Sequence, residues 1–369
     1  MSNAIIKTKD LAVGYDNKVL IPDINFEVKK SEILVLIGPN GSGKSTILKT
    51  ITKQLSDLGG VVYLRDNELK KLSEKDVSKE MSLLLTKQPN PDYMSVEEMV
   101  STGRYPYTGR FGVLSENDKK IVGEYIKAVD LEDIKDKDFN LISDGQRQRV
   151  MLARALCQEP EILIMDEPTS YLDIHYKIEL ISILKKMVRE KNIAVVMSLH
   201  ELDLAGRCAD KLLCISNGHI DRYGNSDEIF LDDGYIEELY GVEKGSYIKE
   251  YGSIELEKIT GNPKTFVISG GGRGIHIYRK LQKSGIPFVA GIIYENDIEY
   301  PIANALATKV IRENSFEEIK DENISAAKKY IDLCDNVICT LNKFGAMNLK
   351  LKELVSYAKE KNKLCDGGI

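Results

Sequence analysis

Nine consecutive residues combine glycines, a lysine and hydroxyl side chains in a pattern suited to phosphate chemistry. They fit GxxxxGK[ST] and one further residue, in the order Gly38, Pro39, Asn40, Gly41, Ser42, Gly43, Lys44, Ser45 and Thr46. Glycines let the backbone bend around a phosphate with several N–H groups pointing inward, and a following helix adds its positive N-terminal end. In such a loop we expect Lys44 to reach the β- and γ-phosphates and Ser45 to bind Mg²⁺. The pattern predicts a nucleoside-triphosphate site.

Two adjacent carboxylates follow a second apolar run. Asp166 and Glu167 come directly after Ile162–Met165. Alone, such a pair is more often a helix N-cap or a solvated pair. With the phosphate loop upstream, we expect Asp166 to hold the metal and Glu167 to polarise an attacking water.

These residues need a scaffold that brings distant segments together. Short apolar runs predict four buried strands, Ile33–Ile37, Ile162–Met165, Ile193–Met197 and Leu212–Ile215, and helical patterns lie between them. Strands that alternate with helices predict an α/β fold with a largely parallel sheet covered on both faces. The alternation in Ile5–Val13 and Val19–Val28 predicts antiparallel strands, and about residues 90–150 are expected to form a helical subdomain.

The order and spacing of these motifs resemble a known family. The phosphate loop, the octapeptide ISDGQRQR at Ile142–Arg149, the Asp166-Glu167 pair and His200 resemble the ATPase cassette of ABC transporters over about residues 3–255. The resemblance implies a P-loop NTPase fold with a RecA-like core, an antiparallel β subdomain and a helical subdomain. It also implies hydrolysis of ATP with Mg²⁺.

The resemblance assigns roles to residues that carry no signal alone. It implies that Tyr15 stacks on adenine and that His200 holds the γ-phosphate after the fourth strand. It places Gln88 in the loop that links the nucleotide to a permease, where it acts in catalysis and contacts the metal. Lys44 and Glu167 complete the implied catalytic set.

A further group of residues is implied to act on a second copy of the chain. Ser143, Gly145 and Gln146 belong to the signature motif that binds the γ-phosphate held by the opposite subunit, and Asp173 lies where the subunits touch. The chain has one phosphate loop and one signature, so we expect an ATP-sandwich homodimer. The usual signature is LSGGQ. Here Asp144 replaces a glycine, which weakens docking if its carboxylate faces the phosphate and has little effect if it faces solvent. Tyr171 is a second, smaller departure.

The segment Gly103-Arg104-Tyr105-Pro106-Tyr107 and the later Tyr240–Val242 resemble the iron-siderophore, haem and cobalamin branch of ABC importers. That branch implies integral membrane permease subunits, an indirect substrate-binding protein, and a cytoplasmic position at the inner face of the membrane. The alternative for Gly103–Tyr107 is a generic turn before a helix.

The turn sequence Gly261-Asn262-Pro263 predicts a domain boundary, and the βα alternation restarts after it. We therefore expect residues 1–260 to form the ATPase domain and residues 261–369 a Rossmann-like α/β domain. A glycine-rich stretch in this second domain follows a strand and precedes a helix. It consists of Gly270, Gly271, Gly272, Arg273 and Gly274. The interpretation is that its backbone N–H groups bind a small anionic ligand. Glu295 and Asp297, past the next strand, stand roughly where a Rossmann unit has its ribose-binding acid. The alternative is a tight turn without a ligand.

Length, charge and cysteine content restrict the class of protein to which the chain can belong. The chain has 369 residues and a formal net charge of −6, which gives no reason to expect a nucleic-acid partner. Six cysteines without CxxC spacing favour reduced core thiols. No apolar run has the ~18–20 residues that a membrane-spanning helix needs, so another chain is expected to supply a pore. Two rival functions stay open: a non-transport ABC ATPase, and a regulator whose C-terminal domain senses a ligand.

Overall fold

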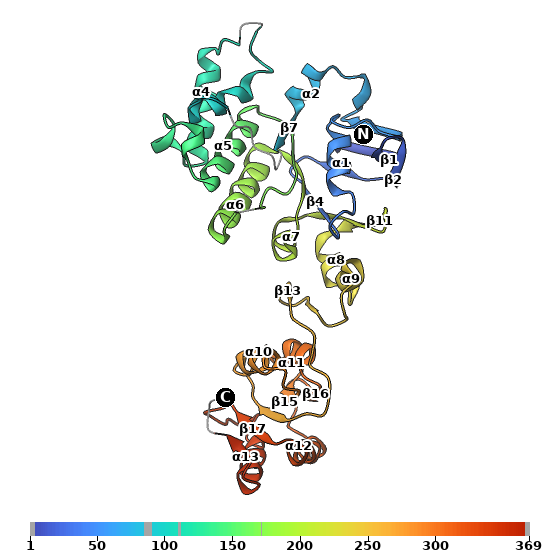
Figure 1. Ribbon diagram of the computed structural model, residues 1–369, viewed down its shortest axis with the longest axis vertical. Helices are drawn as coiled ribbons and strands as arrows, with labels where there is room; N and C mark the ends of the chain where they lie inside the picture. The colour runs from blue at the N-terminus through green and yellow to red at the C-terminus, as the bar shows by residue number, and fades with distance from the viewer. Residues whose placement is uncertain (1–3, 85–90, 110–111, 171, 366–369) are drawn as a thin grey trace. The chain divides into compact units, whose positions relative to one another are not determined.

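The computed structural model describes residues 4–84, 91–109, 112–170 and 172–365. Contacts between residues divide the chain into two compact units, Met1–Asp232 and Asp233–Ile369. Figure 1 shows the helices and strands of both units and labels many of them. Each unit is described separately below.

The first unit is built on a six-stranded sheet with the strand order β11-β10-β4-β9-β8-β7. Its strands are β4 (Ile33–Ile37), β7 (Met81–Leu84), β8 (Ile162–Met165), β9 (Ala194–Ser198), β10 (Lys211–Ser216) and β11 (His219–Asn225). All neighbouring pairs are parallel except β10 and β11. Every residue of β4, β8 and β9 is buried, as expected for parallel strands covered on both faces. The predicted parallel α/β core is confirmed.

The register of the central strands determines where the following loops emerge. Leu36 of β4 pairs with Ser198 of β9, and Met197 of β9 pairs with Met165 of β8. Because the strands are parallel, the segments that follow them leave the sheet at the same edge. The helices of this part are α1 (Lys44–Ile51), α2 (Glu74–Glu80), α6 (Ile174–Lys191), α7 (Leu202–Cys208) and α8 (Ser226–Leu231).

A second, antiparallel sheet lies in the same unit. It contains β1 (Ala4–Tyr15), β2 (Lys18–Ile24), β3 (Glu27–Lys29), β5 (Gly59–Leu64) and β6 (Asn67–Glu68), and the short helix η1 (Leu69–Lys71) follows. The predicted strand Val19–Val28 is divided into β2 and β3. At the break, Asn25 Oδ1 accepts a hydrogen bond from the backbone N–H of Asp10, and Phe26 N–H donates to Thr8 Oγ1. Side-chain oxygens thus act as the acceptors for these two backbone N–H groups.

The helical part comprises α3 (Val96–Ser101), η2 (Thr102–Arg104), α4 (Glu116–Ala128), η3 (Glu132–Ile134), η4 (Phe139–Leu141) and α5 (Asp144–Cys157). The α-helices α3, α4 and α5 each begin with a capping box, in which a serine hydroxyl and a side chain three residues later satisfy the first N–H groups reciprocally. The helices pack on one another, and Figure 1 shows α4 beside α5.

The second unit contains a five-stranded parallel sheet with the order β16-β15-β14-β17-β18. Its elements are α9 (Tyr235–Tyr240), β12 (Tyr247–Ile248), β13 (Ser253–Ile254), β14 (Thr265–Ile268), α10 (Ile275–Lys283), β15 (Phe288–Tyr294), α11 (Tyr300–Leu306), β16 (Lys309–Glu313), α12 (Asp321–Leu333), β17 (Asn336–Cys339), α13 (Leu351–Glu360) and β18 (Leu364–Cys365). Two apolar clusters fill its core. This order, with β14 central, is the Rossmann-like arrangement that the sequence predicted.

The division between the units lies earlier than the predicted boundary after residue 260. Glu255, which is buried, accepts a hydrogen bond from Arg279 Nε at 3.1 Å. Gln282 Nε2 donates to the Glu257 carbonyl at 3.2 Å, and Tyr251 OH donates to the Ile298 carbonyl. These contacts attach the segment before the glycine-proline turn to the second unit, and nothing in the local composition indicates them.

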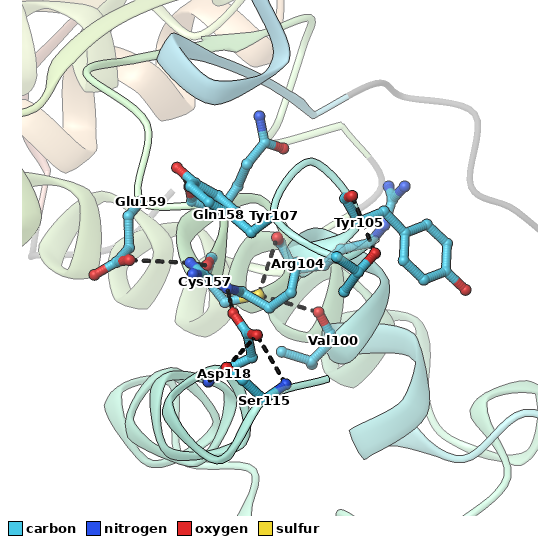
Figure 2. Close-up of polar contacts among 11 residues, drawn as sticks. Val100, Arg104, Tyr105, Tyr107, Ser115, Asp118, Cys157, Gln158 and Glu159 are labelled. Atoms are coloured by element: carbon cyan, nitrogen blue, oxygen red, sulfur yellow. Dashed lines mark hydrogen bonds and ion pairs between the residues drawn. The ribbon is translucent and has the colours of Figure 1, made fainter. Parts of the chain in front are cut away.

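The segment that resembles the importer branch has a structural role in the helical part. Figure 2 shows Arg104 among groups from three segments. Its guanidinium donates to Asp118 Oδ1 at 2.9 Å, to the Cys157 carbonyl at 2.7 Å and to Glu159 Oε2 at 3.0 Å. It also lies 4.1 Å from the centre of the Tyr107 ring. Arg104 and Asp118 are both buried, so this is a shielded ion pair that joins η2 to α4 and α5.

We predict that Arg104→Met lowers the free energy of unfolding by about 3 kcal/mol, because it leaves the buried Asp118 carboxylate without its cation. Hydrogen bonds from Ser115 and the Arg104 guanidinium lower the pKa of Asp118. A lowered pKa in the folded state stabilises the protein above the unfolded pKa, and that contribution is lost in acid. The difference between wild type and variant in urea unfolding should therefore be largest near neutral pH and shrink below about pH 4.

Lys119→Met is the matched control, because Lys119 pairs with Glu116 on the exposed face of the same helix. We expect this change to leave the free energy of unfolding almost unchanged, because water screens an exposed pair. Equal losses for the two variants would contradict the role given to the buried pair.

Candidate nucleotide-binding site

The loop between β4 and α1 has a backbone shape that requires glycine. Gly38 has a φ of +146°, and a Cβ there would lie 2.1 Å from the Ile215 carbonyl oxygen of β10. Gly43 has a φ of +103°, and a Cβ there would lie 2.6 Å from Ile21 Cδ1. Side chains are excluded at both ends, so the bare backbone curves toward the start of α1, as a phosphate-binding loop requires.

Lys44 is the cation of this loop. Its side chain is buried, and Nζ donates to the Gly38 carbonyl at 2.8 Å and to the Pro39 carbonyl at 3.0 Å. Burial lowers the pKa of Lys44, while the nearby carboxylates of Glu167 and Asp166 act in the opposite direction. The Ser42 hydroxyl in the same loop is buried and has no hydrogen-bond partner within the protein. A buried unsatisfied hydroxyl beside a cation fits a site that accepts phosphate oxygens.

Asp166 is held by hydroxyl groups from two other elements. Its Oδ1 accepts hydrogen bonds from Ser45 Oγ of α1 at 3.0 Å and from Ser198 Oγ of β9 at 2.8 Å. A serine hydroxyl and a carboxylate oxygen are hard oxygen donors of the kind that Mg²⁺ prefers. The structure thus brings together two of the three predicted metal-binding residues, Ser45 and Asp166.

Glu167 and His200 form a direct pair at the same edge of the sheet. Glu167 Oε1 lies 2.6 Å from His200 Nε2, and Ser170 Oγ donates to Glu167 Oε2 at 3.1 Å. The backbone N–H of Glu167 donates to Ser198 Oγ at 2.8 Å. Glu167 has a φ of +48°, a left-handed conformation that is uncommon for a side-chain-bearing residue. A carboxylate fixed in this way beside an imidazole is suited to accept a proton.

The predicted adenine residue also lies at the loop. Thr46 Oγ1 donates to Tyr15 OH at 3.3 Å, which connects the end of β1 to α1. The Tyr15 residue is 47% exposed, so its ring remains accessible from solvent. Gln88, predicted for the metal and for catalysis, and Tyr171 lie outside the described residues.

The signature residues are on another part of the first unit, and Figure 1 shows α5 apart from α1. Ser143 caps α5 and forms a capping box with Gln146. A Cβ at Gly145 would lie 2.6 Å from the Tyr176 ring of α6, which explains the glycine. The Asp144 side chain is 81% exposed and pairs with Arg147 at 3.3 Å. The unusual carboxylate therefore faces solvent with a cation beside it, the case in which its effect on docking is small.

Asp173 occupies the N-cap of α6. Its Oδ1 accepts a hydrogen bond from the Tyr176 backbone N–H at 3.0 Å. Asp173 is exposed, and its helix begins beside the signature glycine through Tyr176. The structure thus places Asp173, Gly145 and Ser143 in one region that is separate from the phosphate loop.

Sequence reasoning missed several residues of the site. Ser198, which joins Asp166 to Glu167, is fully buried at the last position of β9. A polar residue that ends an otherwise apolar buried strand is a signal that could have identified it. Glu201 and Thr169, which are hydrogen-bonded to each other at 2.8 Å, have no comparable sequence signal.

The glycine-rich stretch of the second unit does not form the open anion cradle considered from the sequence. The Gly271 N–H donates to Asp297 Oδ2 at 2.7 Å, and the Gly274 N–H donates to Glu299 Oε2 at 2.8 Å. Glu299 is fully buried and also accepts a hydrogen bond from Tyr278 OH at 2.8 Å. Carboxylates of the chain itself occupy these amides, and they would repel an anionic ligand. The Asp297 carboxylate is thus already hydrogen-bonded to the loop backbone. Glu295 pairs with Arg312 at 2.9 Å.

Comparisons with known proteins agree with the geometry of the first unit. The ABC transporter family profile matches residues 21–170, and a profile described as the MJ0874 family matches residues 288–365. An uncharacterized ABC transporter ATP-binding protein of Methanocaldococcus jannaschii is 45% identical over 78% of this chain and 99% of its own length. The iron(3+)-hydroxamate import ATP-binding protein FhuC of Bacillus subtilis is 35% identical over 62% of this chain and 85% of its own length.

A solved structure extends the likeness to three dimensions. It is the dimeric, post-hydrolysis state of an ATP-binding cassette bound to ADP and phosphate, with a TM-score of 0.53 and 25% identity over 60% of this chain and 98% of that one. In the part of the chain that the structure describes, no helix is both long and apolar enough to cross a membrane. The chain belongs to the ATP-binding proteins of the ABC transporter family, and this membership confirms the P-loop fold, the binding of ATP and the ATP hydrolase activity expected from its motifs.

Proposed function

We propose that this chain hydrolyses ATP to drive uptake of an iron-siderophore, haem or cobalamin-type metal chelate through a separate membrane permease. One observation carries the ATPase part: Lys44, Asp166 and the Glu167–His200 pair converge where β4, β8 and β9 end. The cargo class is supported by the likeness to the iron-hydroxamate import protein and by the Gly103–Tyr107 segment. Among these chelates an iron-siderophore is favoured, because that relative is named for an iron-hydroxamate.

Each residue of the site has a proposed role in hydrolysis. The loop amides and Lys44 bind the phosphates, and Tyr15 supports the adenine. Ser45 and Asp166, with Gln88, would hold Mg²⁺, which supplies charge neutralisation on the phosphates when bound. Glu167 accepts the proton of the attacking water, and His200 orients Glu167 and the γ-phosphate. Their 2.6 Å contact keeps the base in place before the reaction.

We propose that two copies of the chain enclose ATP between them. Large apolar side chains are exposed around the signature and Asp173, with Leu141 at 83% and Ile174 at 77% exposure. We propose that the second copy covers these apolar side chains in the dimer. Ser143, Gly145 and Gln146 of one copy then reach the nucleotide of the other.

The permease is proposed to contact the helical part of the first unit. Tyr93 and Val113 are strongly exposed there, and Tyr105 is more than half exposed. A chain attached to a permease in this way lies at the cytoplasmic face of the membrane, and a substrate-binding protein takes part only through the permease.

We predict that Glu167→Gln lowers kcat for ATP hydrolysis about 100- to 1,000-fold, because the amide cannot accept the proton of the water. ATP binding should persist, and the ATP-bound dimer should accumulate in gel filtration. The control is Glu190→Gln at an exposed position of α6, which should hydrolyse ATP at the wild-type rate. Normal turnover by Glu167→Gln would contradict the role of Glu167.

We predict that Ile174→Asp prevents ATP-dependent dimerisation without affecting the fold, because the exposed side chain contributes little to the core. Analytical ultracentrifugation in the Glu167→Gln background with ATP should show a monomer. Val113→Asp, which is equally exposed in the helical part, should still dimerise. A stable dimer of the Ile174→Asp protein would exclude this surface.

The function is tested by uptake in cells. We predict that a strain without this chain fails to accumulate a radiolabelled ferric hydroxamate, that the wild-type gene restores uptake, and that Lys44→Ala does not. Haem and cobalamin uptake, measured in the same strain, distinguish the cargoes. Undiminished uptake of all three would contradict an importer function, whereas the ATPase assignment would be unaffected.

A further inference from the structure

Glu201 follows His200 directly, and its carboxylate joins two segments on the far side of the site. Its Oε2 accepts a hydrogen bond from Thr169 Oγ1 at 2.8 Å, and its Oε1 accepts one from Lys177 Nζ at 2.6 Å. Thr169 is in the segment after Asp166 and Glu167, and Lys177 is in the first turns of α6. One side chain therefore connects the end of β9, the end of β8 and the beginning of α6.

These contacts are partly shielded from water. Thr169 is fully buried, and the Lys177 and Glu201 side chains are 24% and 27% exposed. Burial opposes the ionisation of Glu201, but hydrogen bonds from Lys177 and Thr169 outweigh it and lower its pKa. The Glu201–Lys177 ion pair is partly buried, and Thr169 is hydrogen-bonded to it. It therefore holds the segments that carry these three residues more firmly than a fully exposed ion pair would.

The other end of the connection reaches the residues that face a second copy. Lys177 lies four residues after Asp173, the N-cap of α6, and its backbone N–H donates to the Asp173 carbonyl at 3.0 Å. Tyr176, the neighbour of Lys177, lies against Gly145 of the signature. Arg149 of α5 is over the Tyr176 ring and pairs with Glu179 of α6 at 3.3 Å.

We propose that Glu201 is a positioning residue that ties His200 to the first turns of α6. Through this tie, the group that holds the γ-phosphate in one site is mechanically joined to Asp173 and to the signature, which act on the other site. The inference rests on the proposed dimer and on the proposed role of His200. A continuous chain of packed and hydrogen-bonded side chains is the kind of connection through which two sites are coupled.

The test uses full-length Glu201→Gln, Lys177→Met and the double variant. Each single change removes one charge of the pair and should lower kcat about 3- to 30-fold, with ATP affinity of the monomer unchanged. In the Glu167→Gln background, each should weaken the ATP-bound dimer by a similar factor. The double variant should be no worse than either single one, because all three lack the same interaction.

Lys185→Gln is the matched control. Lys185 is on the same helix, and its Nζ donates to the Arg207 carbonyl of α7 at 2.9 Å, away from His200. It should hydrolyse ATP and dimerise like the wild type. Thermal unfolding of all variants separates positioning from general destabilisation.

Three results would overturn the inference. They are unchanged kcat and dimer affinity in Glu201→Gln, strictly additive losses in the double variant, and an equal loss in Lys185→Gln. The proposed function fails separately: it is rejected if the wild-type chain hydrolyses no ATP, whereas normal hydrolysis by His200→Ala and Glu167→Gln rejects the roles given to those two residues. Loss of activity in those two with wild-type behaviour of Glu201→Gln rejects only the role of Glu201.

Discussion

The parallel register of β4, β8 and β9 is the constraint on which the nucleotide site depends. Leu36 of β4 pairs with Ser198 of β9, and Met197 of β9 pairs with Met165 of β8. The segments that follow these three strands therefore leave the sheet side by side. Because the strands are buried on both faces, they contain almost no polar side chains, and the reactive groups can stand only after the last residues of the strands. Ser198 is the exception. Its hydroxyl donates to Asp166 and accepts from the Glu167 N–H, so it fixes the distance between the proposed metal ligand and the proposed base.

Charge balance explains why the groups at this edge occur together. Lys44 is buried, which disfavours its cationic form, and the carboxylates of Asp166 and Glu167 favour it. A triphosphate brings several negative charges toward those same carboxylates. The loop amides, Lys44 and the metal proposed at Ser45 and Asp166 would supply the positive charge that makes such an approach favourable. The solvent-facing Asp144, paired with Arg147, adds little to this field because water screens it.

The sequence predicted features that are written in adjacent residues. The glycine loop, the apolar strands, the Asp166-Glu167 pair and the parallel α/β architecture all have local signals, and the family comparison confirmed the fold. It could not predict partners that are far apart in the chain. Ser198 is 32 residues from Asp166, and Lys177 is 24 residues from Glu201. The boundary between the units was displaced for the same reason, since Glu255 belongs to the second unit through Arg279 rather than through its neighbours.

The two glycine-rich loops show why a local pattern indicates a backbone shape but not its ligand. Each follows a buried strand and precedes a helix. In the first loop the nearby cation is Lys44, and the Ser42 hydroxyl lacks a partner within the protein, so the site can accept an anion from outside. In the second loop, the amides of Gly271 and Gly274 bind Asp297 and Glu299 from the same unit. A buried carboxylate with several donors is fully satisfied, and it stabilises the turn as a ligand would.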